Sequence, residues 1–333
     1  MTTLEDIAQA IGTTKSTVSK ALNGAEDVSE FMRQTVLEKA VELGYNRRIR
    51  TKSVPTIAIF ITNMEYERPG DFGYDLILGF RKAAEPAGYN VTIVPLTIEL
   101  QQHSSYDTYM LQQNFLGGFF LGLSFIDPWL QQFETCKTPT VLYDNHVSEN
   151  PFVSHLGVDN TEGMNIAVNY IRSLGHEKIG YLSHALDSYV YRQRHQAFFQ
   201  ALESNYLTPD PNLAGSAFHI SDCLSEHLPR LLEMGCTAIL CSHDILASSA
   251  LIYCTELGLS IPKDISIVGF DDIPLCQHTS PPLSTIRQDR ESLGKSAFYA
   301  FTSQFNHVAI STLLLHPKLV IRSSCAPYSS NDS

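Results

Sequence analysis

The sequence contains 333 residues, of which 44% are hydrophobic and 17% are charged. This length exceeds one ordinary domain, and this composition excludes a chain that is disordered throughout. The formal net charge of −12 argues against a protein that coats nucleic acid or anionic membranes along its whole length. The charge is uneven, because residues 1–52 hold eight Lys or Arg against seven Asp or Glu, whereas the remaining residues carry −13. The N-terminal end therefore needs an interpretation of its own.

Export and metal-binding signals do not stand out in this sequence. The N-terminal stretch MTTLEDIAQAIG has acidic residues where a signal peptide has basic ones, and no apolar run approaches the roughly 20 residues of a membrane span. The seven cysteines show no C-x-x-C spacing, and Cys241, Cys254 and Cys276 lie in apolar runs. We expect buried, reduced thiols, a cytoplasmic location, no membrane partner, and neither a metal nor a cofactor.

Residues 1–45 are predicted to form three short helices. Their apolar stripes are Leu4, Ile7, Ala8 and Ile11; then Val18, Ala21 and Leu22; and then Met32, Val36, Leu37, Ala40 and Leu43. Thr13 or Thr14 can cap the second helix and Ser29 the third, whereas Gly12 and Gly44 suit helix ends. A helix, a tight glycine turn and a second helix have the spacing of a helix-turn-helix unit.

Residues 46–56, NRRIRTKSVPT, are interpreted as a basic linker closed by Pro55. Beside a small helical domain of this kind, Arg47, Arg48 and Arg50 are expected to contact DNA phosphates. The alternative is a solvated tether without a binding role.

From residue 57 onward the pattern changes to alternating strands and helices. Strands are predicted at Ile57–Ile61, Val91–Pro95, Gly118–Leu123, Thr140–Tyr143, Ile179–Ser183, Ala238–Cys241 and Ile265–Phe270. Such apolar strands, separated by helices, indicate parallel sheets built from βαβ units. The stretch is too long for one sheet of ordinary size, so we predict two α/β lobes. Late strands at Leu283–Arg287 and Lys318–Arg322 are expected to connect back between the lobes.

Eight segments in this order carry a resemblance to a known family. They are TLEDIAQAIGTTKSTVSKALNG (3–24), VSEFMRQTVLEKAVELGY (28–45), LGVDN (156–160), SLGHEKIGYLS (173–183), YRQRHQAF (191–198), IPKDISIVGFDD (261–272), PPLSTIRQD (281–289) and LVIRSSCAP (319–327). Together they resemble the LacI/GalR family of bacterial transcriptional repressors over nearly the whole chain. A helix-turn-helix alone is a weak signal, but the downstream segments make the match specific.

The resemblance implies a domain layout and a function. It implies a helix-turn-helix domain at 1–45, the linker at 46–56, a two-lobed domain of periplasmic-binding-protein type at 57–328, and a disordered tail at 329–333. Lobe 1 is expected near 57–157 plus 288–316, and lobe 2 near 158–285 plus 317–328, each a Rossmann-like parallel sheet. The implied function is a nucleoid-associated repressor, a homodimer whose operator affinity changes when an effector alters the angle between the lobes.

The expected DNA contacts come from the second helix, which enters the major groove in a helix-turn-helix. By resemblance, Lys15, Ser16 and Lys20 occupy base-reading positions, and these side chains can donate to guanine O6 and N7 or, for Ser16, also accept. The positions placed to bind phosphates are Thr14, Thr17, Ser19 and Asn23. A solvated polar helix face is the alternative interpretation.

The expected effector site lies at the carboxyl ends of the parallel strands. Asp144 and Asp271 end strand segments, and Arg194 is expected near the start of a helix. Carboxylates with an Arg fork suit the hydroxyls of a sugar. Phe72, Tyr74 and Phe218 could supply apolar faces. By resemblance, Asp144, Arg194 and Asp271 contact the effector, and Leu76, Gly122, Phe218 and His243 line its site.

Some residues in this region have structural interpretations as well. Asp244 is expected to cap a helix, and Asp272 could do the same. His243 stands where many sugar-binding relatives have Asn, which leaves a nucleobase, nucleoside or phosphorylated effector as the alternative. Trp129 is expected to pack on the lobe surface and not to stack on the ligand.

Two departures from the family concern assembly and DNA bending. The short linker lacks the Leu-containing hinge helix of relatives, so Ile49 is the one candidate for a minor-groove wedge and a nearly straight operator is expected. No leucine-rich heptad segment follows Pro327, so we expect a dimer in place of a tetramer. An exported binding protein has no use for residues 1–45, and an enzyme is disfavoured because phosphate-loop and nucleophile-elbow motifs are absent.

Overall fold

The computed structural model describes residues 2–45 and 54–328. These residues form two compact units, Met1–Met64 with Leu76–Leu156 and Gly294–Leu313, and Glu65–Asp75 with Gly157–Leu293 and Leu314–Ser333. The first contains the N-terminal helices. Compared with the expected lobe boundaries, residues 65–75, 157, 288–293 and 314–316 fall in the second unit. The predicted tail at 329–333 and the linker residues 46–53 lie outside the described residues.

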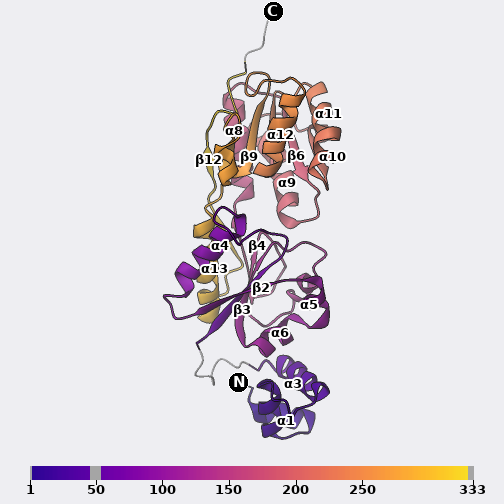
Figure 1. Cartoon of the computed structure of the whole chain (residues 1–333), viewed down its shortest axis with the longest axis vertical. Coiled ribbons are helices and arrows are strands. Elements are labelled where there is room, and N and C mark those ends of the chain that lie inside the picture. Colours follow the sequence, from indigo (N-terminus) through magenta and orange to yellow (C-terminus); the bar gives the residue numbers. More distant parts are fainter. Residues whose placement is uncertain (1, 46–53, 329–333) are drawn as a thin grey trace, which may run out of the picture. The chain divides into compact units, whose positions relative to one another are not determined.

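The headpiece, residues 2–45, consists of α1 (Leu4–Ile11), α2 (Lys15–Leu22) and α3 (Glu30–Glu42) (Figure 1). This confirms the three predicted helices. Thr14 accepts a hydrogen bond from the backbone N–H of Thr17, and Ser29 caps α3 in the same way. Gly12 ends α1 with φ 69°, a conformation that favours glycine. The predicted apolar stripes meet in one small core, in which Ile7, Val18, Val36 and Ala40 are fully buried. Leu43, predicted to continue the third stripe, follows the end of α3 and is exposed.

Sheet A has six strands in the order β11-β5-β4-β3-β1-β2. The bounds are β1 Thr56–Ile61, β2 Asn90–Pro95, β3 Phe115–Leu121, β4 Thr140–Tyr143, β5 Val153–Val158 and β11 Thr312–Leu315. Neighbouring strands from β2 to β5 pair in parallel, as the apolar runs predict.

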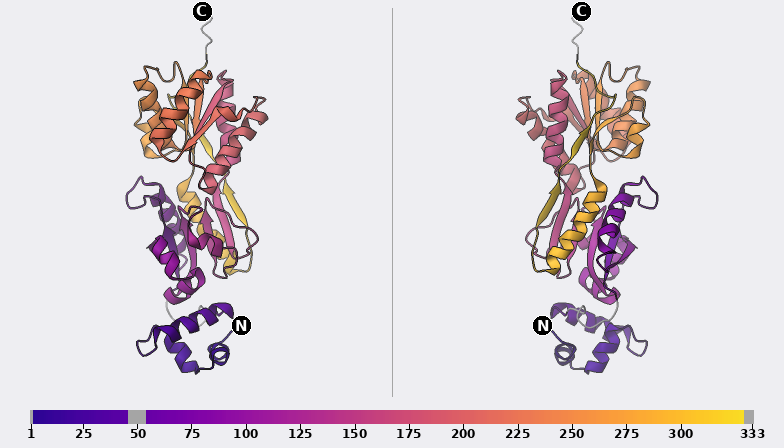
Figure 2. Two further views of the ribbon diagram at one scale, coloured as in Figure 1. Left: turned by 90° about the vertical axis from the view of Figure 1, so that its right-hand side faces the viewer. Right: turned by 90° about the vertical axis from the view of Figure 1, so that its left-hand side faces the viewer.

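Helices cover both faces of sheet A (Figure 2). Their bounds are α4 Phe72–Ala84, α5 Ile98–His103, α6 Tyr106–Gln113, α7 Pro128–Gln132 and α13 Arg290–Phe305. On one face, Phe80 of α4 stacks on Phe119 of β3 with ring centres 5.5 Å apart. On the other, Phe60 of β1 stacks on Phe120 of β3 at 4.6 Å and meets Trp129 of α7 edge-on. Sheet A is therefore held largely by aromatic packing.

Sheet B has six strands in the order β12-β10-β9-β8-β6-β7. The strands are β6 Ile179–His184, β7 Ala214–Ala217, β8 Ala238–Cys241, β9 Ser266–Asp271, β10 Ser284–Arg287 and β12 Lys318–Val320. The pairs from β7 to β10 are parallel, and β12 runs antiparallel to β10. Its helices are α8 Asn160–Ser173, α9 Tyr189–Ser204, α10 Ile220–Asp222, α11 Leu228–Glu233 and α12 Asp244–Glu256. Two cores result, one under α8 and α9 and one under α11 and α12.

Three strands were not predicted, and each has a physical reason. β5 carries Ser154 and His155 within its buried run, and β7 is AGSA without a β-branched residue. β11 alternates exposed and half-buried residues, which is typical of a sheet edge. The two predicted late strands are confirmed as β10 and β12, which both belong to sheet B. Between them the chain adds the unpredicted β11 to sheet A and then returns to sheet B at β12.

Buried residues confirm one sequence expectation and correct another. Cys241, Cys254 and Cys276 are buried free thiols, as the apolar runs indicate. Trp129, expected on the surface, is fully buried and donates from Nε1 to the Ser104 carbonyl at 2.8 Å. Within the described ranges, no helix is long and apolar enough to cross a membrane.

Candidate DNA-binding and effector-binding sites

The second headpiece helix, α2, presents the three predicted base-reading side chains outward. Lys15, Ser16 and Lys20 are exposed, whereas Val18 and Leu22 face the headpiece core. This division follows from the helical period, because the two buried positions lie four residues apart. The arrangement leaves one polar face of α2 accessible to a partner.

The predicted phosphate-binding residues border the same helix. Thr14 and Thr17 share a hydrogen bond of 2.9 Å between their hydroxyls, and Asn23 Nδ2 donates to the Ser19 carbonyl at 2.8 Å. These bonds order both ends of α2. The remaining phosphate candidates, Arg47, Arg48 and Arg50, and the candidate wedge Ile49, lie outside the described residues.

Arg194, near the start of α9, has 3% of its side chain exposed. Its Nε donates to Asn160 Oδ1 at 2.9 Å, and its Nη1 donates to the Ser242 carbonyl at 2.6 Å. Its Nη2 lies 3.2 Å from Asp271 Oδ1, and its guanidinium carbon lies 3.8 Å from the centre of the Phe270 ring. Contacts on three edges and one face fix the plane of this guanidinium.

Asp271 is the last residue of β9 and has φ 115°, an unusual conformation for a residue with a side chain. Its Oδ1 accepts a 2.6 Å hydrogen bond from Gln288 Nε2 in addition to the contact with Arg194. The two predicted clamp residues, Arg194 and Asp271, therefore do meet at the carboxyl end of sheet B.

His243 caps α12, because its Nδ1 accepts a hydrogen bond of 3.2 Å from the backbone N–H of Leu246. The sequence prediction that Asp244 is the cap was wrong. In the neutral ring this bond leaves the proton on Nε2. Burial and the charge of Arg194 lower the pKa of His243 to about 3, so the ring is neutral at physiological pH.

Aromatic rings continue from His243 along this end of sheet B. Tyr191 lies 5.9 Å from His243 and 5.3 Å from His184 between ring centres, and Phe218 lies 5.5 Å from His184. Phe218 is 63% exposed, so much of this residue is accessible to a ligand. The predicted lining residues Phe218 and His243 thus belong to one row of rings.

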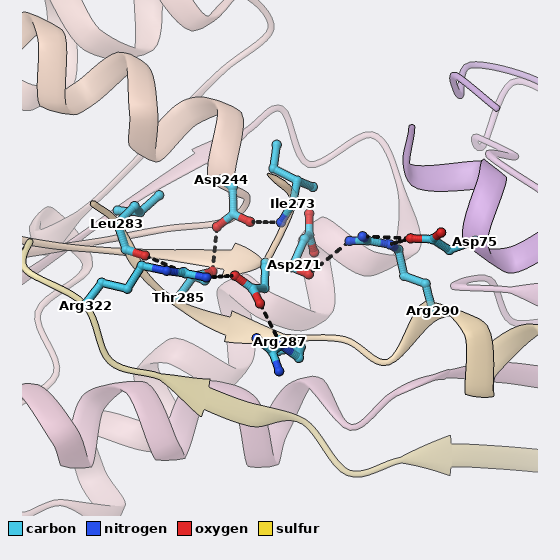
Figure 3. Close-up of polar contacts among 10 residues, drawn as sticks. Asp75, Asp244, Asp271, Ile273, Leu283, Thr285, Arg287, Arg290 and Arg322 are labelled. Carbon is cyan, nitrogen blue, oxygen red and sulfur yellow. Dashed lines mark hydrogen bonds and ion pairs between the residues drawn. The ribbon is translucent and has the colours of Figure 1, made fainter. Parts of the chain in front are cut away.

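Asp244, the first residue of α12, is buried between two strands (Figure 3). Its carboxylate accepts from Thr285 Oγ1 at 2.5 Å and from the backbone N–H of Ile273 at 2.9 Å. Glycine at position 269 leaves room for the Asp244 carboxylate, since a Cβ there would lie 2.2 Å from Asp244 Oδ1. Burial and the nearby charge of Asp271 raise the pKa of Asp244 to about 7.

Asp272 forms a structural ion-pair cluster, which replaces the helix-cap role considered from the sequence. Arg287 Nε donates to its Oδ2 at 2.6 Å, and Arg322 Nη2 donates to its Oδ1 at 2.7 Å. Arg322 also donates from Nη1 to the Leu283 carbonyl at 2.7 Å. The cluster ties the end of β9 to β10 and to the segment after β12 (Figure 3).

Residues 65–75 contribute two predicted lining residues to the second unit. Arg290 Nε and Nη2 donate to Asp75 Oδ2 at 3.1 and 3.0 Å, and Nη1 donates to the Asp271 carbonyl at 3.3 Å (Figure 3). The Arg290 guanidinium carbon also lies 5.2 Å from the centre of the Phe72 ring. Phe72 and Tyr74, the two predicted residues, are both half-buried.

The first unit holds the other predicted effector residues. Asp144 directly follows β4 with φ 50° and is half-buried. Gly122 follows β3 with φ +80°, and a Cβ there would lie 1.8 Å from the Thr62 carbonyl oxygen, so only glycine fits. Leu76 is fully buried, and its carbonyl lies against Gly294 of α13.

The sequence interpretation missed several residues that build this site. They are Asp75, Asn160, Gln288, Arg290 and Thr285, which hold the named candidates in place. Two of them could have been found from the sequence, because they lie in segments that carry the family resemblance: Asn160 ends LGVDN, and Gln288 lies in PPLSTIRQD. What could not be found from the sequence is which side chain reaches which partner across the sheet.

Comparisons with known proteins agree with this architecture. The family described as "Bacterial regulatory proteins, lacI family" matches residues 3–48, and the "Periplasmic binding protein-like domain" matches residues 168–325. The HTH-type transcriptional regulator MalR of Streptomyces coelicolor is 30% identical over 98% of this chain and 97% of its own length. The chain belongs to the LacI family of bacterial regulatory proteins.

Other LacI-family proteins are similar over the same span. The HTH-type transcriptional repressor CytR of Escherichia coli is 28% identical over 97% of this chain and 96% of its own length. The structure of a CelR–cellobiose complex has a TM-score of 0.70 at 24% identity, covering 97% of this chain and 100% of that one. A lac repressor dimer bound to operator has a TM-score of 0.67 at 23% identity, covering 98% and 99%. The chain thus has the LacI-type fold and, like these relatives, is a DNA-binding transcriptional regulator.

Proposed function

We propose that this regulator is a cytoplasmic, homodimeric repressor whose affinity for its operator is controlled by a small polar effector, a sugar. The main support for effector binding is the buried Arg194, whose guanidinium plane is fixed at the carboxyl end of sheet B beside Asp271. A fixed Arg fork next to a carboxylate matches neighbouring hydroxyl groups.

The best-defined of the proposed effector contacts lie in the second unit. There Arg194 and Asp271 clamp the polar side of the ligand, and the exposed ring of Phe218 covers its C–H side. The neutral His243 donates from Nε2 to an acceptor oxygen. The further proposed positions are Asp144, Gly122, Leu76, Phe72 and Tyr74.

The test of the effector proposal is a thermal-shift screen with three sets of compounds. Sugars including cellobiose are compared with nucleobases and nucleosides, and with phosphorylated sugars. A hit stabilises the native state by RT ln(1 + [L]/Kd), so above Kd the stabilisation grows with the logarithm of the ligand concentration. A shift with sugars alone supports the proposal, and a shift confined to nucleosides or to phosphorylated sugars would replace the sugar by that class. No shift with any of the three sets would contradict it.

The proposed DNA contacts divide into base reading and phosphate binding. Lys15, Ser16 and Lys20 read base edges from the exposed face of α2. The proposed phosphate contacts are Thr14, Thr17, Ser19, Asn23, Arg47, Arg48 and Arg50. The first set decides the operator sequence, and the second adds affinity for DNA of any sequence.

Lys15→Ala should relax or switch the preferred base, with a loss of roughly 1–3 kcal/mol for the lost contact. Arg47→Ala should weaken binding to all DNA alike and reduce the salt dependence by about one unit. Selection of binding sites from a random duplex library measures the first effect, and salt titration measures the second. An unchanged consensus for the Lys15→Ala protein would refute its base-reading role.

A further inference from the structure

The headpiece carries a net negative charge although it is a DNA-binding domain. Residues 2–45 hold four Lys or Arg residues against seven Asp or Glu, a net of −3. Affinity for DNA of any sequence comes mainly from cations placed on phosphates. This helical surface is therefore poorly suited to hold DNA unselectively.

Each of the four cations in the headpiece also lies next to a carboxylate. The pairs are Lys15 with Glu5 at 3.6 Å, Lys20 with Asp27, Arg33 with Glu30 at 3.9 Å, and Lys39 with Glu42 at 2.5 Å. Two of these pairs involve the proposed base-reading lysines, and the other two lie on α3.

The two carboxylates beside α2 come from outside that helix. Glu5 is in the first turn of α1, and Asp27 is in the turn that follows α2. All four side chains of these two pairs are more than half exposed, between 51% and 71%. The hydrogen bond from Lys20 lowers the pKa of Asp27, so this carboxylate is charged at neutral pH. Two negative charges therefore flank the face of α2 that would meet DNA.

We propose that Glu5 and Asp27 are specificity-determining residues that suppress binding to DNA lacking the operator sequence. The inference rests on the proposed base-reading role of Lys15 and Lys20. On a non-operator duplex the lysines keep their carboxylate partners, and the carboxylates repel the phosphates. On the operator, guanine O6 and N7 accept from a lysine and take the place of its carboxylate.

The exchange is feasible because exposed ion pairs contribute little to stability. A base acceptor at the right position therefore displaces the carboxylate at a small cost. A phosphate, whose position along the groove is the same for every sequence, gains no such advantage. The two pairs thus lower the affinity for random DNA more than the affinity for the operator.

The test uses the full-length protein with Asp27→Asn and Glu5→Gln, each of which removes one charge and keeps the shape. Fluorescence anisotropy measures binding to a duplex of random sequence and to the operator obtained by selection with the wild-type protein. Each variant should bind the random duplex about two- to five-fold more tightly, with a smaller change on the operator. The ratio of the two affinities should fall accordingly, and further in the double variant.

Glu42→Gln on α3 is the matched control, since it removes the same charge from a pair that does not involve α2. It should leave the affinity ratio unchanged. An equal rise in random-duplex binding for this control, or an unchanged ratio for both test variants, would overturn the inference. If selection with the wild-type protein returned no consensus at all, the proposed operator recognition itself would fail, which is a different outcome. Thermal unfolding of each variant checks that the headpiece remains folded.

Discussion

Sheets A and B have the same strand order but different stabilising chemistry. In both, the second strand of the set lies at one edge, followed by the first, third, fourth and fifth, with a late strand at the other edge. Sheet A is packed by rings, with Phe60, Phe120 and Trp129 in mutual contact. Sheet B ends instead in buried charged groups, among them Arg194 and Asp244.

The difference shows which parts of the chain determine the strand order and which parts supply the buried polar groups. Apolar strand runs and crossover helices determine the shared order, whatever follows the strands. The residues just after β8, β9 and β10 carry the polar side chains that distinguish sheet B, namely Asp244, Asp272 and Gln288. In sheet B the buried polar groups therefore gather at the strand ends, and particular residues inside the strands, such as Gly269 and Thr285, accommodate them.

The largest expected effect comes from removing Arg194, the charge that most clearly separates sheet B from sheet A. Arg194→Ala leaves Asp271 and the Ser242 carbonyl without their buried partner, at a cost of roughly 3–5 kcal/mol in the free energy of unfolding. Chemical denaturation measures this cost. Arg192→Ala is the control, because Arg192 is exposed and should cost under about 1 kcal/mol. Equal costs for the two variants would show that the buried Arg194 stabilises sheet B no more than an exposed Arg does.

A smaller loss of stability is expected at the end of β3 in sheet A, where close backbone packing, and not a charge, restricts which residue fits. Gly122→Ala forces a Cβ toward the Thr62 carbonyl oxygen at positive φ and should destabilise by roughly 2–3 kcal/mol. Gly88 also has positive φ, +85°, but a Cβ there would meet nothing within 4 Å. Gly88→Ala should therefore cost only about 1 kcal/mol. Denaturant unfolding of both variants separates the cost of close packing from the cost of backbone strain. If Gly122→Ala cost no more than Gly88→Ala, the contact with the Thr62 carbonyl oxygen would not affect stability.

The smallest expected effect is the pH dependence caused by His243 in sheet B. Its pKa is lowered to about 3 in the folded state, from the ordinary value of 6.5, so unfolding takes up a proton below pH 6.5. The stability it supports is present above that pH and is lost as the pH falls toward 3, by about 1–2 kcal/mol at pH 5. His243→Asn keeps a capping side chain and should remove this loss. Unfolding at pH 7 and pH 5 tests the difference, and an equally acid-sensitive variant would assign the effect to other groups.

Much of the fold could be predicted from the sequence, because it depends on local patterns. The capping residues Thr14 and Ser29, and the run Thr140–Tyr143, carry their signals within a few residues. Strands such as AGSA (214–217) carry no such signal, since their place in the sheet is decided by the neighbouring β6.

The candidate site was predictable only in part. Arg194 and Asp271 could be named from the family resemblance, and they do meet. Their supports could not, because Asn160 reaches Arg194 from a position 34 residues away in the sequence. The helix cap at His243 was missed because a following Asp is the commoner capping residue, whereas here that Asp is drawn into the sheet by Thr285.

The late edge strands of both sheets have a consequence for the order in which the chain folds during synthesis. The headpiece is complete after residue 45 and makes its core from neighbouring helices, so it can fold as soon as it leaves the ribosome. Sheet A must wait for β11 at Thr312–Leu315, and sheet B for β12 at Lys318–Val320. Until then β5 and β10 are unpaired edges, open to association with other nascent chains. The headpiece of each polypeptide is therefore finished well before the two sheets that follow it.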